Sequence, residues 1–342
     1  MRKKIALLIP HHFNIYEGII KNLNSAGFDV EILVLTDTGF RYKNIWQQVN
    51  NFIQKSFLRN NRYKKDLRVN FYSDLLTKTL ENHIGTVDYS MVIRPDYFSP
   101  QSLQLLKEKS KFIVGYQWDG FKRYPEVLKY IPLFDRFFTF DREDFENYKN
   151  VFANLKPTTN FYLDNVDIGQ VKNEGTVFFL GSYLPNRIDD IIIIANYLKA
   201  ENIKTSIQIL YSHSKIPTKL ANAPLTLRPE KANYMEMIQE MQKAECLLEF
   251  KNLDVHNGLS FRVFEAIAYK KKLITNDPHI RVFDFYHPEN IFIWENNNLS
   301  GVKDFLSKKY VDIDQKIVEK YAFTNWIHYV LDIEPYEPIN NI

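Results

Sequence analysis

The sequence predicts an α/β fold divided into two domains of nearly equal size. Short apolar runs alternate with amphipathic stretches along the chain, as they do in parallel α/β folds. This alternation fades once, in a polar stretch between residues 160 and 175. A chain of 342 residues is long enough for two domains that each bury a core. We therefore expect one domain over residues 1–168 and a second over residues 169–342.

The expected elements of the first domain are strands separated by helices. A helix over residues 16–26 ends at Ala26-Gly27, where glycine is the favoured residue after a helix. Further helices are expected over residues 72–83 and 102–109. The expected strands are Ile5–Ile9, Val30–Leu35, Tyr89–Ile93, Phe112–Tyr116 and Arg136–Thr139.

The second domain repeats this alternation. Helices are expected over residues 188–200, 234–243 and 261–270, and a terminal helical stretch over residues 322–331 is expected to pack on either domain. The expected strands are Thr176–Leu180, Thr205–Leu210, Cys246–Phe250, Lys272–Thr275 and Ile291–Trp294.

Composition narrows the class of protein. Hydrophobic residues make up 45% of the chain and charged residues 25%, which is ordinary for a globular protein. The single cysteine, Cys246, excludes an internal disulfide framework, and its apolar surroundings (CLLEF) predict that it is buried. No metal site built on several cysteines is possible, and a cytoplasmic protein is expected.

The N-terminus predicts a strand. Basic residues precede an apolar run at Ile5–Ile9, but this run ends at Pro10 and is too short for a signal peptide. No other run approaches the roughly 20 apolar residues that a membrane-spanning helix needs. We therefore expect a protein that is not integral to a membrane.

A local basic segment lies at residues 55–68. The net charge of +3 does not indicate a nucleic-acid-binding protein. One interpretation of the segment is a solvated face or loop. The other is a peripheral surface that meets anionic lipid headgroups or a lipid-diphosphate acceptor at the inner face of the membrane. Its basic residues are Lys55, Arg59, Arg62, Lys64, Lys65 and Arg68, interleaved with Phe57, Leu58 and Tyr63.

The first motif is FFLGSYLPNR, from Phe178 to Arg187. A hydrophobic strand runs into Gly181, a polar turn follows, and Arg187 opens the next helix. In parallel sheets ligands bind beyond the carboxyl ends of the strands, where helix N-termini attract anions. Glycine lets the backbone approach a ligand, and arginine supplies positive charge for a phosphate. The alternative is an ordinary strand-turn-helix with a surface arginine.

The second motif is HNGLSFRVFEAIAYKKKLITND, residues 256–277. Arg262 and Glu265 lie three residues apart on a helix, on a stripe separate from its apolar face. An arginine and the amides of the first turn suit a diphosphate, and a carboxylate suits the hydroxyls of a ribose. The alternative is a surface ion pair of little energetic value. The helix is preceded by Asn257, Gly258, Leu259 and Ser260.

Together the two motifs resemble the donor-binding half of GT-B glycosyltransferases, most closely the CgeB-like and group-1-like bacterial enzymes. The resemblance covers roughly residues 176–295. It implies two Rossmann-like domains facing each other across a cleft, an N-terminal domain for the acceptor and a C-terminal domain for a nucleotide-sugar donor. It also implies that the sugar is transferred to a glycan or to a lipid-linked acceptor, in the synthesis of a bacterial cell-surface polysaccharide or a lipopolysaccharide-type glycan.

The resemblance implies roles for individual residues. Glu265 would bind the donor ribose, Arg187 and Arg262 would face the diphosphate, and no metal ion or other cofactor is required. Arg228 and Lys231, within Leu225–Met241, are secondary candidates for the base or the phosphates. Many retaining members carry a glutamate eight residues before the ribose-binding one, but this chain has Asn257 there. Retention is therefore not supported, and the stereochemistry stays open.

The general base is expected in the N-terminal domain, because an inverting transfer needs a group that takes the acceptor's proton. His11 and His12 follow the first strand directly. Asp119 (YQWDGFKRYP) follows the strand at residues 112–116, among aromatic residues that suit a sugar ring. Asp96 (RPDYF) is a further candidate. The alternatives are histidines bonded to the loop backbone and an aspartate that caps a turn or helix.

The sequence lacks the motifs of several other enzyme classes. There is no G-x-G-x-x-G for a dinucleotide, no GxxxxGK[ST] phosphate loop and no G-x-S-x-G nucleophile elbow. The remaining alternative from another class is a non-catalytic nucleotide-sugar-binding or assembly protein on the same fold. Product formation distinguishes that alternative from a transferase.

Overall fold

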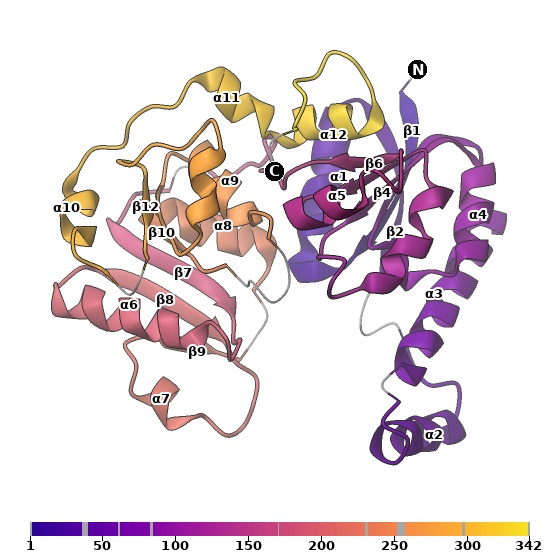
Figure 1. Cartoon of the computed structure of the whole chain (residues 1–342), viewed down its shortest axis with the longest axis horizontal. Coiled ribbons are helices and arrows are strands. Elements are labelled where there is room, and N and C mark those ends of the chain that lie inside the picture. The colour runs from indigo at the N-terminus through magenta and orange to yellow at the C-terminus, as the bar shows by residue number, and fades with distance from the viewer. Residues whose placement is uncertain are drawn as a thin grey trace. The chain divides into compact units, whose positions relative to one another are not determined.

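The computed structural model describes residues 2–35, 40–60, 62–82, 85–169, 171–229, 232–251, 257–295 and 298–340. Residue contacts divide the chain into two units, each built around its own parallel sheet (Figure 1). The N-terminal unit takes in residues 1–12, 19–157 and 330–332. The C-terminal unit takes in residues 13–18, 158–329 and 333–342.

The sheet of the N-terminal unit has the strand order β2-β1-β3-β4-β5-β6, and all its pairings are parallel. Strand β1, the second in this order, reads as a continuous apolar run, because helices cover both faces of such a sheet. Residues 5–9 of that strand are completely buried. The strands are β1 (Lys3–Pro10), β2 (Phe28–Leu35), β3 (Val87–Ile93), β4 (Ser110–Gln117), β5 (Arg136–Thr139) and β6 (Leu155–Pro157).

The helices between these strands pack apolar residues onto the sheet. Tyr72, Leu76 and Leu80 share one face of α3 at helical spacing and belong to the buried core of the unit. The helices are α1 (Ile15–Ser25), α2 (Ile45–Ser56), α3 (Tyr63–Asn82), α4 (Pro100–Glu108) and α5 (Arg142–Tyr148). Short 3-10 helices lie at η1 (His12–Asn14), η2 (Pro95–Tyr97), η3 (Pro125–Lys129) and η4 (Ile131–Leu133).

The sheet of the C-terminal unit has the strand order β12-β11-β10-β7-β8-β9, again all parallel. Its strands are β7 (Thr176–Ser182), β8 (Thr205–Leu210), β9 (Thr226–Arg228), β10 (Ala244–Glu249), β11 (Lys272–Thr275) and β12 (Ile291–Ile293). Cys246 is a free, buried thiol within β10, as expected from its apolar neighbours.

The helices of the C-terminal unit cover this sheet in the same way. In α6 the buried residues Ile188, Ile191, Ile194, Ala195 and Leu198 recur at helical spacing and form part of the core. The helices are α6 (Ile188–Ala200), α7 (Thr218–Ala221), α8 (Tyr234–Lys243), α9 (Phe261–Ala268), α10 (Val302–Ser307), α11 (Gln315–Lys320) and α12 (Phe323–Leu331), with η5 at Pro278–Val282.

The structure confirms the predicted α/β fold class and every strand named from the sequence, to within about two residues at each end. Gly27 follows α1 with a φ of 89°, as expected for the residue after a helix. Strands β6 and β9 and helices α2, α5, α7, α10 and α11 were not expected. Among the described residues, no helix combines the length and apolar content needed to cross a bilayer.

Each sheet has one point where the chain reverses the direction in which it adds strands. In the N-terminal unit this switch lies between β1 and β3, and in the C-terminal unit between β7 and β10. Loops leave such a pair of strands in opposite directions, so a crevice opens at their carboxyl ends and ligands bind there. The switch points therefore decide where a site is to be sought.

Candidate functional site

Both sequence motifs fall at the switch point of the C-terminal unit. Strand β7 ends at Gly181 and Ser182, its neighbour β10 ends at Glu249, and α9 begins at Phe261. The parallel pairing of β7 and β10 places both carboxyl ends at the same edge of the sheet. Topology thus brings together two segments that are about 70 residues apart in the sequence.

Gly181 leaves room for the Arg187 guanidinium. A Cβ atom at residue 181 would lie 2.9 Å from Arg187 Nη2 and 2.9 Å from Phe179 Cζ, which is closer than a side chain tolerates. Arg187 occupies the N-cap position of α6 and donates from Nη2 to the Ser182 carbonyl at 2.8 Å. Glycine is therefore needed at residue 181 because the Arg187 side chain packs against the backbone at the end of β7.

Arg262 ties the ends of the two strands together. Its Nη2 donates to the Leu180 carbonyl at 2.6 Å, and its Nη1 lies 3.2 Å from both the Leu248 carbonyl and Glu249 Oε2. The guanidinium also lies over the Phe179 ring, at 5.0 Å from its centroid. Arg262 thus pairs with Glu249, and the surface ion pair with Glu265 that the sequence left open is not formed.

Among the described residues, the switch point carries more positive than negative charge. The guanidinium carbons of Arg187 and Arg262 lie 5.7 Å and 5.0 Å from the centroid of the same Phe179 ring, and Glu249 is the carboxylate beside them. Burial lowers the pKa of Arg187, Glu249 opposes this effect, and the neighbouring Arg262 adds to it. Two guanidinium groups that share one carboxylate favour an anionic ligand.

Glu265 is a buried carboxyl group, only 1% exposed. Its Oε1 accepts a hydrogen bond from the Tyr234 hydroxyl at 2.6 Å, and its Oε2 has no partner in the described structure. Burial raises the pKa of Glu265 to about 7, although the Tyr234 hydrogen bond and Arg262 both act to lower it. The sequence placed Glu265 on a polar stripe, and the structure buries it because α8 brings Tyr234 against this face of α9.

Residues 257–260 lead into α9 at the switch point. Leu259 is 5% exposed, and its carbonyl accepts from Asn160 Nδ2 at 2.8 Å. Ser260 is the N-cap, yet its side chain makes no cap hydrogen bond, and its buried Oγ has no partner among the residues that the structure describes. An N-cap serine normally bonds the amides of the first turn. Asn257 and Gly258 precede this position in the same turn.

Buried polar atoms without partners gather at this switch point. In the described structure they include Arg187 Nε, Ser260 Oγ, Arg262 Nε and Glu265 Oε2. Such atoms are rare in folded proteins because each costs about 1–3 kcal/mol unless something satisfies it. All four belong to residues that the two motifs single out, so the cluster has the donors and the acceptor of a polar, anionic ligand site.

The secondary candidates lie elsewhere or are not described. Arg228 ends the outer strand β9, which is separated from β7 by β8, and its Nη1 lies 3.1 Å from Gln208 Oε1. Neighbouring strands are spaced about 4.8 Å apart, so this position is about 10 Å from β7 across the sheet. Lys231 and His256 lie outside the described residues.

In the N-terminal unit, His11 and His12 follow β1 at its switch point. The His11 backbone amide donates to the Leu35 carbonyl at 2.9 Å, which fixes the loop to the end of β2. The His12 ring is 5.9 Å from the Trp118 ring, measured between centroids. The backbone of Phe13 is in the left-handed region, with a φ of 55°. This is unusual for a bulky residue and marks a sharp turn after β1.

Asp119 is bound by two arginines. Arg94 Nη1 donates to its Oδ2, and Arg123 Nη1 donates to its Oδ1 at 3.2 Å. Arg94 is 8% exposed and also forms a two-pronged pair with Asp96, at 2.8 Å and 2.9 Å. Asp96 is 3% exposed, so its carboxylate is an internal counter-ion. The arginine after β3 thus fixes both aspartates that the sequence offered as bases.

Gln117 is a feature that the sequence did not reveal. It ends β4 next to Trp118 and Asp119, it is completely buried, and neither Nε2 nor Oε1 has a partner in the described structure. A glutamine at the last position of an apolar strand is the only signal that the sequence carries. Its amide offers both a donor and an acceptor at the carboxyl end of the sheet.

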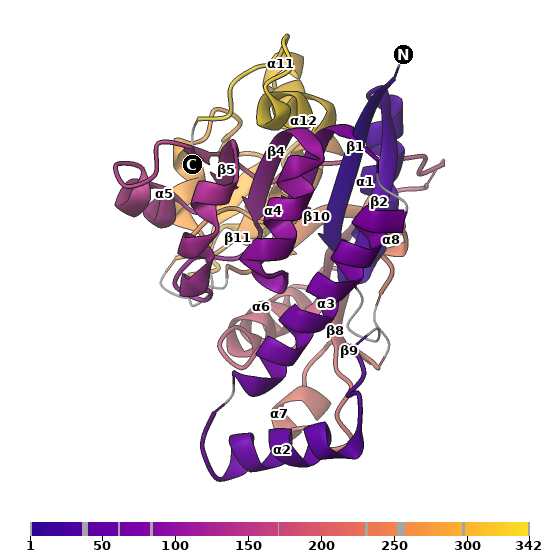
Figure 2. The same ribbon diagram turned by 90° about the vertical axis from the view of Figure 1, so that its right-hand side faces the viewer.

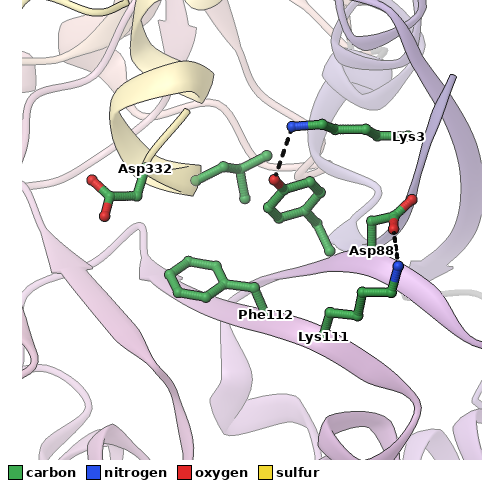
Figure 3. Close-up of a pocket in the computed structure, with 7 residues that line it drawn as sticks. Lys3, Asp88, Lys111, Phe112 and Asp332 are labelled. Atoms are coloured by element: carbon green, nitrogen blue, oxygen red, sulfur yellow. Dashed lines mark hydrogen bonds and ion pairs between the residues drawn. The ribbon is translucent and has the colours of Figure 1, made fainter. Parts of the chain in front are cut away.

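A pocket of about 270 Å³ lies at the opposite end of the same sheet (Figure 3). Its charged groups already have partners: Lys111 pairs with Asp88 at 2.7 Å, Lys3 donates to the Tyr89 hydroxyl at 3.2 Å, and Asp332 pairs with Arg136 at 3.0 Å. The two lysines, Asp88 and Tyr89 come from the amino-terminal ends of β1, β3 and β4. This pocket therefore does not belong to the candidate site. In the described part of the chain, no group of three or more His, Cys, Asp or Glu side chains is placed to hold a metal ion.

Comparisons with known proteins concern the fold. No protein-family model and no curated protein matches the sequence. Among solved structures, the E. coli trehalose-6-phosphate protein bound with UDP-2-fluoro glucose matches with a TM-score of 0.61 at 10% identity, over 97% of this chain and 100% of that chain. Sucrose-phosphate synthase from Thermosynechococcus elongatus matches with a TM-score of 0.53 at 11% identity, over 94% and 95% of the two chains.

A UDP-N-acetylglucosamine 2-epimerase matches with a TM-score of 0.53 at 10% identity, over 99% of both chains. At such identities the likeness establishes the fold. The two six-stranded α/β units are those of GT-B glycosyltransferase structures. Because an epimerase has the same fold, the reaction has to be argued from the residues of the site.

Proposed function

We propose that this protein is a glycosyltransferase that moves a sugar from a nucleotide-sugar donor to a glycan or lipid-linked acceptor without a metal ion. The observation that carries the proposal is a cluster of buried polar atoms at the β7/β10 switch point that have no partner in the described part of the chain, on Arg187, Ser260, Arg262 and Glu265. A nucleotide sugar has the matching groups, since its diphosphate is anionic and its ribose hydroxyls donate hydrogen bonds.

Each group in the cluster has a role in this proposal. Glu265 Oε2 accepts a hydrogen bond from a ribose hydroxyl, while Tyr234 holds Oε1 in place. Arg187, Arg262 and the first-turn amides of α9 hold the diphosphate. They stabilise the negative charge that develops on it as the sugar leaves. The two guanidinium groups supply the positive charge that metal-dependent transferases take from an ion, so we propose a metal-independent reaction.

The acceptor and the general base belong to the N-terminal unit in this proposal. Because both oxygens of Asp119 accept hydrogen bonds from arginines, we assign the base to His11 or His12 and a positioning role to Asp119. The imidazole takes the proton of the acceptor hydroxyl as that oxygen attacks the anomeric carbon. Trp118 and the Gln117 amide lie beside this position and suit the face and the hydroxyls of a sugar.

The pathway remains part of the proposal. The motifs resemble those of CgeB-like and group-1-like bacterial enzymes, which supports a role in cell-surface polysaccharide or lipopolysaccharide synthesis. Such a role places the protein in the cytoplasm, at the inner face of the membrane where lipid-linked acceptors lie. Because Asn257 stands where many retaining enzymes carry a glutamate, the configuration at the anomeric carbon has to be measured on the product.

A thermal-shift series tests the donor site. The full chain is heated with UDP, GDP, ADP and CMP and with their common sugar conjugates, beside Glu265→Gln and the control Glu81→Gln on the exposed surface of α3. A ligand that binds only the folded state at a hundred times its Kd adds about 2.7 kcal/mol of stability. We expect one nucleotide family to raise Tm in the wild type and in Glu81→Gln, and to lose most of this effect in Glu265→Gln. The absence of any nucleotide effect would overturn the proposal.

Turnover separates the transferase from the non-catalytic alternative. Release of nucleotide from the stabilising donor is measured with and without a bacterial lipid or glycan extract as acceptor. We expect acceptor-dependent release that falls by about 10²-fold or more in a His11→Ala, His12→Ala double variant, while the nucleotide-induced rise in Tm persists. Donor binding without any turnover would favour a nucleotide-sugar-binding protein.

A further inference from the structure

Helix α2 presents an apolar face to solvent. The exposed fractions are 75% for Ile45, 78% for Trp46 and 63% for Phe52. Val49 and Ile53 are also exposed, and the helix buries none of its residues. Beyond its end, Phe57 and Leu58 are 74% and 63% exposed. An apolar stretch of this kind usually marks a surface that is covered by something else.

The exposed apolar residues share one side of the helix. Positions 45, 46, 49, 52 and 53 follow the i, i+1, i+4, i+7, i+8 spacing of a single helical face. The opposite side carries polar residues: Gln47, Asn50, Asn51, Gln54 and Lys55. A 12-residue helix gains little from local propensity alone, so its apolar face needs a packing partner.

The helix stands apart from the sheet of its unit. Figures 1 and 2 both show α2 at the far end of α3, away from the strands that α3 covers. Its first turn is closed by Asn44, whose side chain accepts from the Gln47 amide. The sequence therefore specifies a defined helix, and α3 holds it clear of the core.

Basic residues flank the apolar face. Residues 41–68 contain eight Lys and Arg residues and one acidic residue, Asp66, whereas the rest of the chain has 36 basic and 40 acidic residues. The positive charge of the chain is thus concentrated here. Lys43 pairs with Asp74 at 4.0 Å, and Lys65 pairs with Glu126. Exposed basic side chains in this segment are Arg41, Lys43, Lys55, Arg59, Arg62 and Lys64.

We propose that α2 docks the N-terminal unit onto an anionic lipid bilayer. Its apolar face lies in the boundary between headgroups and acyl chains, and the flanking lysines and arginines contact the headgroup phosphates. Interfacial helices combine these two features: a tryptophan- and phenylalanine-bearing face and a basic surround. Charge complementarity selects the bilayer, because a nucleic acid would match the cations but leave the aliphatic and aromatic face in water.

Membrane docking rests on the proposed function for its biological role, because a lipid-linked acceptor lies at a membrane. Its physical basis is separate, since no residue of α2 belongs to the nucleotide-sugar site. Failure of one proposal can therefore be told from failure of the other by measuring vesicle binding and nucleotide-induced stabilisation on the same variants.

The test is sedimentation of the full chain with vesicles of phosphatidylcholine alone and of phosphatidylcholine with 30% phosphatidylglycerol. We expect binding to the anionic vesicles only, weakening as salt is raised. Trp46 provides a second readout, because it is 78% exposed, whereas Trp294 and Trp326 are buried and Trp118 is half-buried. Its fluorescence should shift to shorter wavelength on the anionic vesicles, and this shift should be absent from the variant that replaces Trp46.

Two double variants and their controls complete the test. Trp46→Gln with Phe52→Gln removes the apolar anchors, and its control is Val151→Gln with Val282→Gln, at positions that are 67% and 55% exposed. Arg59→Glu with Arg62→Glu reverses two charges, and its control is Lys215→Glu with Lys309→Glu, two exposed lysines outside the segment. We expect each α2-region variant to weaken vesicle binding by about tenfold or more, and each control to change it less than twofold.

Three results would overturn the inference. The first is no binding to anionic vesicles, and the second is equal loss in the variants and their controls. The third is a dimer in solution that Trp46→Gln with Phe52→Gln dissociates, which would make the apolar face an interface between copies of the chain. All four double variants should keep the nucleotide-induced rise in Tm, so a loss of vesicle binding cannot be ascribed to unfolding.

Discussion

Gly181 shows how a single residue sets the geometry of the candidate site. A methyl group there would collide with the Arg187 guanidinium and the Phe179 ring, both 2.9 Å from the Cβ position. The guanidinium is the easier of the two to displace, because Phe179 is completely buried in the core. A change at this position should therefore act first on the anion-binding arginine.

We predict that Gly181→Ala weakens nucleotide binding as well as folding. Overpacking at a tight position costs about 1–3 kcal/mol of stability, and loss of a charge-assisted hydrogen bond to a phosphate costs up to about 3 kcal/mol of affinity, a factor of about 10². Titration calorimetry with the stabilising nucleotide measures the affinity, and urea unfolding measures the stability. Gly85→Ala is the control, because a Cβ at residue 85 meets nothing within 4 Å. Equal affinity in both variants would contradict the assignment of Arg187.

Glu265 makes stability depend on pH. Burial raises its pKa from 4.5 to about 7 in the folded state, so the folded protein holds the proton over a range in which the unfolded chain has lost it. Its contribution to the free energy of unfolding is complete below about pH 4.5 and is lost as the pH rises through 7. Each pKa unit corresponds to about 1.4 kcal/mol, so the total change is about 3 kcal/mol.

We therefore predict that Glu265→Gln flattens this dependence. Urea unfolding between pH 4.5 and 8 should show the wild type losing about 3 kcal/mol relative to the variant as the pH rises. Asp144, whose pKa burial also raises to about 7, contributes equally to both proteins and cancels in the difference. A wild-type-to-variant difference that is constant over this range would show that Glu265 is ionised in the fold.

At the scale of elements, the ends of strands β3 and β4 depend on one arginine. Arg94 has a left-handed φ of 63° and donates to Asp96 and Asp119, and its guanidinium lies 4.0 Å from the centroid of the Tyr124 ring. Removing one partner of a buried ion pair leaves the other charge uncompensated, which costs about 3–5 kcal/mol. Asp96, 3% exposed, is the charge that would be left.

We predict that Arg94→Met lowers the free energy of unfolding by about 3–5 kcal/mol. Arg123→Met is the matched control, because Arg123 bonds the other oxygen of Asp119 but is 48% exposed, and exposed pairs contribute about 0–1 kcal/mol. Urea unfolding at pH 7 compares the two. Similar losses would mean that the network around Asp119 is held by the loop backbone and not by the buried arginine.

The elements also show what the sequence could predict and what it could not. Strand β11 and helix α6 matched their predicted bounds, because their apolar residues follow the period of the structure and pack on one core. Helix α2 was missed although its apolar residues keep the spacing of one helical face, and its exposure could not be expected, because that spacing is the same for a buried and an exposed face. The burial of Glu265 was missed for a different reason: its partner Tyr234 is 31 residues away, and only folding brings α8 against α9.

The candidate site was predicted at the level of its residues and not of their pairings. The sequence predicted that Gly181 and Arg187 of FFLGSYLPNR and Arg262 and Glu265 of the second motif belong to one site. The structure places these residues at the switch point. The sequence could not show that Arg262 selects Glu249, because this choice depends on the register of β10 against β7. For the same reason it could not show that Asp119 is held by Arg94 from the neighbouring strand.

At the scale of the whole molecule, the chain passes between its two units more than once. The C-terminal unit begins at Thr158, whereas the sequence suggested residue 169, and it also includes residues 13–18. Residues 158–164 are fixed to the last helix of that unit: the Trp326 indole donates to the Thr159 carbonyl at 3.0 Å, and the Asp164 carboxylate accepts from the Thr324 hydroxyl at 2.6 Å.

Phe161 is the main apolar contribution of this segment. It is completely buried, and its ring centroid lies 4.5 Å from that of Trp326, 5.0 Å from that of Phe323 and 5.1 Å from that of Phe261. Loss of a buried phenylalanine costs about 3–5 kcal/mol. A cut after residue 168 removes this side chain from the core of the C-terminal unit, and a cut after residue 157 retains it.

We therefore predict that a fragment of residues 158–342 is more stable than a fragment of residues 169–342 by about 3–5 kcal/mol or more. Both fragments lack residues 13–18, so this deficit is shared and cancels in the comparison. Urea unfolding followed by tryptophan fluorescence gives the difference. Because the proposed donor site lies within the C-terminal unit, the stabilising nucleotide should also raise Tm of the longer fragment. Equal stability of the two fragments would place the physical boundary after residue 168, and a folded longer fragment without nucleotide response would show that the donor site needs more than this unit.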